Sequence, residues 1–108
     1  MNDAEFAARA DATLDRIEAA LEASGVAADV ERKEGGIVEI EFADGSRMIV
    51  NRHGAAREIW VAARSGGFHF RWDGAAWRDT RDSTELFAAL SRLVSAQSGQ
   101  AVILRPVP

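Results

Sequence analysis

Residues 37–72 read IVEIEFADGSRMIVNRHGAAREIWVAARSGGFHFRW, and this stretch carries the clearest structural pattern in the chain. Apolar and polar residues alternate along it, and turns such as Asp44-Gly45 and Gly66-Gly67 interrupt the alternation. This arrangement is typical of an antiparallel sheet that buries one face. Asp44-Gly45 favours a two-residue hairpin turn, in which both central residues take positive φ. The residues expected to face the core are Val38, Ile40, Phe42, Met48, Val50, Ile59, Val61, Phe68 and Phe70.

A helical pattern precedes this sheet. Over residues 2–24, apolar residues recur at steps of four, four, three and four, which gives the helix one apolar stripe. Asn2 is the expected N-cap, and Gly25 is the expected C-terminal stop. A short strand is then expected around Val30. The residues of the apolar stripe are Phe6, Ala10, Leu14, Ile17 and Leu21.

A second helix is predicted after the sheet, with a cap at Asp82 or Ser83 and an end at Gly99. The apolar tail 101–104 is expected to pack on the core. The order helix, about six antiparallel strands, helix predicts an α+β two-layer sandwich in which both helices cover one face of the sheet. We expect residues 1–108 to form a single domain of this kind. The apolar face of the second helix is Leu86, Phe87, Leu90, Leu93 and Val94.

The composition limits the classes of protein to which the chain can belong. It has 108 residues, no cysteine and a net charge of −4, so disulfides and thiolate chemistry are excluded. Residues 1–34 hold nine acidic and four basic residues, a net charge of −5, which argues against nucleic acid and favours a cation or a basic protein. No apolar run approaches the ~20 residues of a membrane helix, and no signal-peptide pattern opens the chain. We therefore expect a cytoplasmic protein with no membrane partner.

Four acidic residues follow a helical rhythm of their own on the first helix. We call this group, Asp11, Asp15, Glu18 and Glu22, the acidic ridge. It lies ~100° around the helix from the apolar stripe. Carboxylates bind hard cations, but one helix face supplies about two of them per ion, so binding would be weak and exchangeable. The ridge also suits docking of a basic protein surface, or it is a solvated face with no ligand. The residues alone leave these interpretations open.

Trp60 is expected on the open face of the sheet. A large outward aromatic side chain is typical of a protein-binding hot spot, around which Asn51, Arg52 and Arg71 would gather. In the alternative interpretation, Trp60 only covers its neighbours on the sheet. Residues 52–57 are expected to form a loop.

The chain shows no motif of an enzyme. His53 and His69 are the only histidines and have no short metal-ligand spacing, so a surface role is expected for both. The serines form no nucleophile elbow, and no glycine-rich loop opens a helix as a phosphate cradle would. We therefore expect a binding protein.

A specific combination of segments points to a family. It joins Asn51-Arg52, the strand with Ile59-Trp60, and the strand at residues 66–70. The segments are MNDAEF (1–6), FADGS (42–46), VNR (50–52), EIWVA (58–62) and GGFHF (66–70). In these segments, and over nearly its whole length, the chain resembles the bacterial frataxin family of the CyaY type. The fold that this resemblance implies is the same two-layer sandwich.

The resemblance implies a regulator of iron–sulfur cluster assembly that binds ferrous or ferric iron weakly, with iron donation as a further role. Its implied partners are the cysteine desulfurase and the iron–sulfur scaffold protein, and a monomer is expected in the iron-free state. The implied metal residues are Asp11, Asp15, Glu18, Glu22, Asp29 and Glu31. The implied partner-binding residues are Glu18, Glu22, Asn51, Arg52, Trp60 and Arg71.

Two alternatives stay open. Alanines at positions 19, 20 and 23 interrupt the ridge, which is thinner than is usual in the family. This favours an interaction module of the same machinery with no physiological metal. A ferrous iron oxidase is the weaker alternative, because no enclosed redox site can be assembled from these residues.

Overall fold

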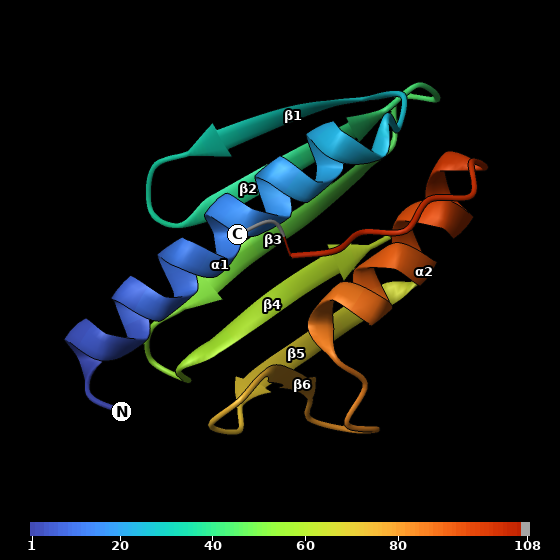
Figure 1. The fold of residues 1–108 in the computed structure, drawn as a ribbon. Coiled ribbons are helices and arrows are strands. Elements are labelled where there is room, and N and C mark those ends of the chain that lie inside the picture. Colours follow the sequence, from blue (N-terminus) through green and yellow to red (C-terminus); the bar gives the residue numbers. More distant parts are fainter. Residues whose placement is uncertain (107–108) are drawn as a thin grey trace.

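The computed structural model describes residues 1–106 and contains two helices and six strands. Their order is α1 (Asp3–Ser24), β1 (Ala28–Lys33), β2 (Ile37–Phe42), β3 (Arg47–His53), β4 (Glu58–Ala63), β5 (Gly66–Trp72), β6 (Trp77–Asp79) and α2 (Leu86–Ser98). The strands form one sheet in sequence order, and each neighbouring pair is antiparallel. Both helices lie on the same side of this sheet (Figure 1), so the predicted α+β two-layer sandwich is confirmed.

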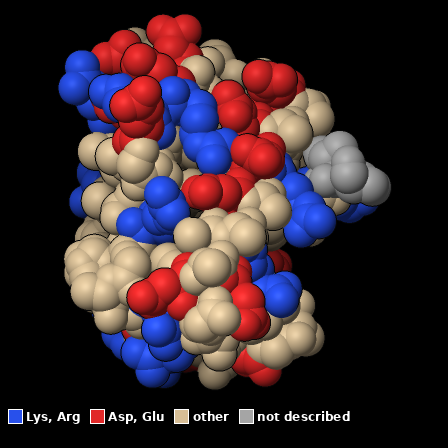
Figure 2. Space-filling model, turned by 90° about the vertical axis from the view of Figure 1, so that its left-hand side faces the viewer, with Lys and Arg blue, Asp and Glu red and all other residues tan. Residues whose placement is uncertain are grey.

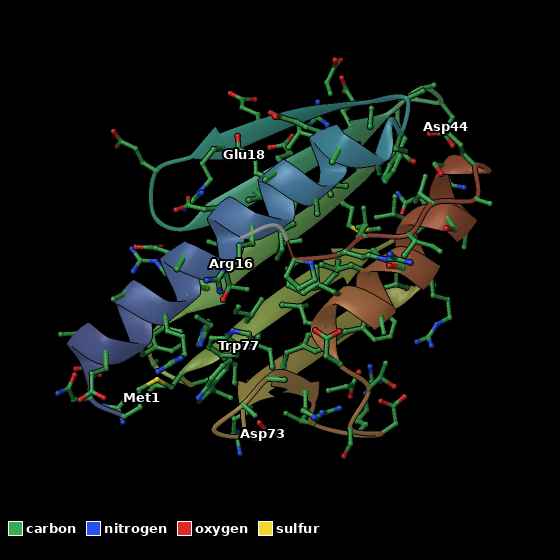
Figure 3. All side chains as sticks on the ribbon, in the orientation of Figure 1. Met1, Arg16, Glu18, Asp44, Asp73 and Trp77 are labelled. Atoms are coloured by element: carbon green, nitrogen blue, oxygen red, sulfur yellow. The ribbon has the colours of Figure 1, made fainter. Side chains whose placement is uncertain are left out.

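The core lies between the sheet and the helices. The sheet residues expected to face inward are buried, except Phe68, which is half-buried. α1 packs on β1, β2 and β3, and α2 packs on β6. Trp77 of β6 lies in the space between the two helices (Figure 3), where its indole Nε1 donates to Thr13 Oγ1 at 2.9 Å. Its ring also meets Phe6 edge-on, with centroids 6.1 Å apart, so Trp77 ties the end of the sheet to α1.

The first helix begins and ends as predicted. Asn2 Oδ1 accepts the Glu5 N–H at 2.8 Å, and Gly25 takes the left-handed conformation with φ 72°. The predicted cap of α2 at Asp82 or Ser83 is wrong. Glu85 caps this helix, because its carboxylate accepts two free backbone N–H groups of the first turn.

The turn between β2 and β3 is wider than predicted. The Phe42 N–H donates to Ser46 O at 2.8 Å, so residues 43–45 form a three-residue turn. Only Gly45 takes positive φ, at 85°. Asp44 Oδ1 accepts the Ser46 N–H at 2.9 Å and so stabilises this turn, which replaces the expected two-residue one.

The C-terminal tail packs as expected. Val102 and Leu104 are buried, and their backbone groups exchange hydrogen bonds with the Ser91 and Ser95 hydroxyls of α2. Within residues 1–106, neither helix has both the length and the apolar composition that a membrane-spanning helix requires.

Candidate functional site

The acidic ridge lies on the exposed side of α1. The Asp15 side chain is 71% exposed and the Asp11 side chain 46%, and Glu22 is also exposed. Glu18 is half-buried at the side of α1 nearest β1 (Figure 3). The apolar stripe on the neighbouring flank is buried. The predicted division of this helix into a buried stripe and an acidic flank is therefore confirmed.

Arginines from the sheet flank the ridge. Arg32 Nη1 lies 2.6 Å from Asp15 Oδ1 and 3.7 Å from Glu18 Oε1. Arg52 Nε lies 3.4 Å from Asp11 Oδ1. On the face that Figure 2 shows, acidic and basic side chains lie next to one another. The arginines neutralise part of the ridge, so it attracts cations less strongly than four unpaired carboxylates would.

Asp29 and Glu31 do not join the ridge. They are exposed, like Lys33 at the end of the same strand, whereas Arg32 turns toward α1. The register pairs Asp29 with Glu41 and Glu31 with Glu39, so these four carboxylates share the open face of the sheet. The structure therefore separates the six predicted metal residues into two groups, one on α1 at the helix side of the sheet and one on the open face of β1.

Basic residues also accompany the second acidic group. Lys33 Nζ pairs with Glu39 Oε2, and Arg47 Nε lies 3.4 Å from Glu39 Oε1. The hydrogen bond from Lys33 holds the pKa of Glu39 below its ordinary value. Within residues 1–106, no three His, Asp or Glu side chains lie close enough together to hold a metal ion. Both groups offer pairs of carboxylates, which bind a hard cation weakly and leave its other positions to water.

Trp60 lies on the open face between two histidines. Its ring stacks on His53 with centroids 3.7 Å apart, and on His69 with centroids 4.4 Å apart. Asn51, Trp60 and His69 stand directly opposite one another on β3, β4 and β5. The outward direction predicted for Trp60 is confirmed, and the stack gives both histidines a contact that their sequence spacing did not indicate.

A buried carboxylate holds this stack in place. Glu58 is 5% exposed, and its Oε1 accepts from Trp60 Nε1 at 2.9 Å. Its Oε2 accepts from Arg71 Nη2, and His69 Nδ1 lies 3.5 Å from Oε1. Burial acts to raise the pKa of Glu58, but the hydrogen bonds from Trp60 and Arg71 outweigh burial and hold this pKa below its ordinary value. Glu58 is not among the predicted site residues, because only the strand register brings it opposite Arg71.

The expected position of Arg52 is wrong. β3 continues to His53, so Arg52 lies within a strand and not at the start of a loop. Consecutive strand residues point to opposite faces, so Asn51 accompanies Trp60 while Arg52 turns toward Asp11 on α1. Asn51 and Arg71 stay beside the Trp60 stack, and Arg52 belongs to the helix side of the sheet.

Comparison with known proteins identifies the class that this fold and these surfaces define. Residues 1–100 match the family model of the frataxin-like domain. The chain belongs to the frataxin family.

Its similarity to individual bacterial members is extensive. The iron-sulfur cluster assembly protein CyaY of Dechloromonas aromatica (strain RCB) is 62% identical over 105 residues, which cover 97% of this chain and 100% of the relative. The protein of the same name from Herminiimonas arsenicoxydans is 50% identical and covers 97% of both chains. The predicted resemblance to bacterial frataxins of the CyaY type is confirmed.

Solved structures agree with this assignment. The frataxin from Psychromonas ingrahamii superposes with a TM-score of 0.87 at 30% identity and covers 95% of this chain and 97% of its own. Trimeric frataxin from the yeast Saccharomyces cerevisiae, complexed with ferrous, gives a TM-score of 0.66 at 26% identity, over 89% of this chain and 87% of its own.

Proposed function

We propose that this protein is a regulator of iron–sulfur cluster assembly that binds iron weakly and docks on the cysteine desulfurase through the acidic ridge. The observation that carries this proposal is the row of exposed and half-buried carboxylates on α1 in a chain of the frataxin family. The names of the bacterial relatives support a role in iron–sulfur cluster assembly, and the ferrous complex of yeast frataxin supports iron as the bound metal. The protein acts here by binding, with no reaction of its own.

Iron is bound cargo in this proposal and not a resident cofactor. Neighbouring ridge carboxylates at i,i+4 are roughly 6 Å apart at Cβ, which lets two of them share a cation without enclosing it. Arg32 and Arg52 compete with iron for Asp15, Glu18 and Asp11. Such iron exchanges readily, which suits both a sensor of iron supply and an iron donor.

Docking uses the same side chains. A row of carboxylates steers a basic protein surface toward α1 and fixes its orientation. The open face, with Trp60 stacked between His53 and His69 and with Asn51 and Arg71 beside it, is proposed as a second protein-binding surface for the scaffold protein. A large, preoriented aromatic side chain loses little conformational entropy on binding, which makes it an effective anchor.

Charge reversal tests the docking surface. We expect the variant with Glu18→Lys and Glu22→Lys to bind the purified desulfurase at least about ten-fold more weakly, because two attractive charges become repulsive. The matched control is Glu34→Lys, an exposed charge reversal in the turn between β1 and β2. Unchanged desulfurase affinity in the ridge variant would contradict the proposal.

An amide NMR titration tests whether metal and partner share the ridge. Ferrous iron is added anaerobically to one labelled sample, and the desulfurase is added to another. We expect both to perturb residues 11–22. If iron leaves these amides unperturbed while the desulfurase perturbs them, the chain is an interaction module with no physiological metal. Catalytic oxygen consumption with ferrous iron that is lost in the ridge variant would instead support an oxidase.

A further inference from the structure

A groove on the helix side of the sheet lies apart from the Trp60 stack and shares with the ridge only the contact of Arg52 with Asp11. It has a volume of about 730 Å³ and lies between the start of α1, the β1–β2 turn and the β3–β4 loop. We call it the arginine groove. It is lined by Asp3, Phe6, Ala7, Gly35, Arg52 and loop residues 54–57. Apart from Phe6 and the charged residues, its walls are alanine and glycine, so backbone and guanidinium groups are accessible to a ligand.

Arg52 enters this groove with unused hydrogen-bonding capacity. Its side chain is 29% exposed, yet within residues 1–106 its guanidinium donates no hydrogen bond to a protein acceptor. Its nearest anion is Asp11, with Nε and Oδ1 3.4 Å apart. The side chain crosses directly over Gly36, where a Cβ would lie 2.2 Å from Arg52 Nε. Arg52 is therefore held in position by packing, with most of its five donors free.

Arg57 supplies the second cation from the β3–β4 loop. It lines the groove and has φ 53°, a left-handed conformation that is uncommon outside glycine. Its Nε and Nη2 both donate to one oxygen of Asp3, at 3.2 and 2.7 Å. The Asp3 side chain is 89% exposed, so this pairing is weak and a stronger anion can replace it.

From this geometry we infer that the arginine groove is an oxyanion site, which takes a small ligand that carries a phosphate or several carboxylates. Two guanidinium groups from different elements converge on one groove, and guanidinium matches both phosphate and carboxylate oxygens in paired hydrogen bonds. Asp3 and Asp11 act as internal anions that keep the arginines oriented while the groove has no ligand. Anion binding in the groove requires neither iron on the ridge nor a docked desulfurase.

An NMR titration of the metal-free chain tests this inference. Inorganic phosphate and citrate are the two probes, each added at constant ionic strength against chloride. We expect one or both to give saturable shifts in the amides of residues 54–57 and in the Nε–H groups of Arg52 and Arg57. A response to phosphate alone identifies a phosphate ligand, and a response to citrate alone identifies a polycarboxylate. Shifts that do not saturate for either probe would overturn the inference.

Variants separate binding from folding. Arg52→Gln and Arg57→Asn are expected to weaken binding at least about ten-fold, because each removes charge-assisted hydrogen bonds. Asn tolerates the left-handed conformation at position 57. Arg92→Gln, an exposed change on α2, is the matched control and is expected to keep the affinity.

A third variant gives a result that misfolding cannot produce. Asp3→Asn removes a competing internal anion, and we expect it to tighten binding about two- to five-fold. Affinity that is retained in both arginine variants, or lost in Asp3→Asn while its amide spectrum stays native, would contradict the assignment of the groove.

Discussion

At the scale of single residues, Gly36 shows how closely two distant segments fit together. It has φ 78°, its carbonyl accepts the Arg52 N–H at 2.9 Å, and the Arg52 side chain lies over its Cα. Gly35 beside it has φ 87°, but a Cβ added there would meet nothing within 4 Å. The two glycines thus share a backbone conformation that disfavours a side chain, and only Gly36 also needs the space.

We therefore predict that Gly36→Ala costs more stability than Gly35→Ala. Both changes carry a backbone cost of about 1 kcal/mol, and Gly36→Ala adds roughly another 1 kcal/mol because it displaces Arg52. Urea unfolding of the two variants measures this difference. Equal losses would mean that the Arg52 side chain adapts without cost.

Glu58 is a buried carboxylate that contacts Trp60, His69 and Arg71 on the open face. Because its pKa is held below the ordinary value of 4.5, its carboxylate contributes stability above pH 4.5, and this contribution is lost as the pH falls through the folded-state pKa. We predict that Glu58→Gln lowers the free energy of unfolding at pH 7 by about 1–3 kcal/mol, since the bond to Arg71 loses its charge.

The pH dependence distinguishes this role from simple packing. The gap in unfolding free energy between the wild type and Glu58→Gln should narrow as the pH falls below 4.5. It should close once the pH is below the folded-state pKa of Glu58, because both chains then carry a neutral group at this position. Glu34→Gln, an exposed change, is the control and should show no such gap. A gap of constant size from neutral to acidic pH would show that the charge of Glu58 contributes nothing.

At the scale of elements, the packing of β1 beside α1 neutralises part of the ridge. β1 is an edge strand, and Arg32 links it to two ridge carboxylates, while Lys33 points to the other face and pairs with Glu39. Adjacent positions on one strand thus act on two different acidic groups. Removing the charge of Arg32 or of Lys33 therefore changes the net charge equally, but on opposite faces of the sheet.

On the proposed function, Arg32→Gln should tighten ferrous binding by the ridge about two- to five-fold, because it frees Asp15 and Glu18 from a competing cation. Lys33→Gln makes the same change of net charge on the opposite face and should leave ridge binding nearly unchanged. Anaerobic titration monitored at the amides of α1 measures both. An equal gain in the two variants would indicate a general effect of net charge.

At the scale of the whole molecule, the two helices and the sheet share one core. Trp77 connects β6 with α1 through Thr13 and Phe6, and the apolar tail closes the core beside α2. Because these contacts span the first and last elements, we predict that the chain unfolds as a single domain in one cooperative step.

Two spectroscopic signals test this cooperativity. All three tryptophans lie between β4 and β6, whereas α1 supplies most of the helical residues. Far-ultraviolet circular dichroism therefore reports mainly the helices, whereas tryptophan fluorescence reports β4 to β6 and the contact of Trp77 with α1. We expect their urea midpoints to coincide. Separate midpoints would show that the chain does not unfold in one cooperative step.

The sequence by itself determined the layers of this protein. The steps of three and four along α1 separated its buried stripe from its ridge, and the alternation of residues 37–72 placed Val38, Ile40 and Trp60 on their correct faces. Such patterns are local, because each depends only on the period of one helix or strand. The family resemblance could be found for the same reason, since its motifs are short segments of consecutive residues.

Only the tertiary structure decided which charges meet. Because β3 extends to His53, the Arg52 side chain points to the helix side of the sheet. Alternation along β1 places Asp29 and Glu31 on the open face, away from the ridge. The register of β4 and β5 places Glu58 opposite Arg71. In a strand, a shift of one residue reverses the face to which a side chain points. Charge pairing between elements therefore depends on registers and strand ends, which no single segment encodes.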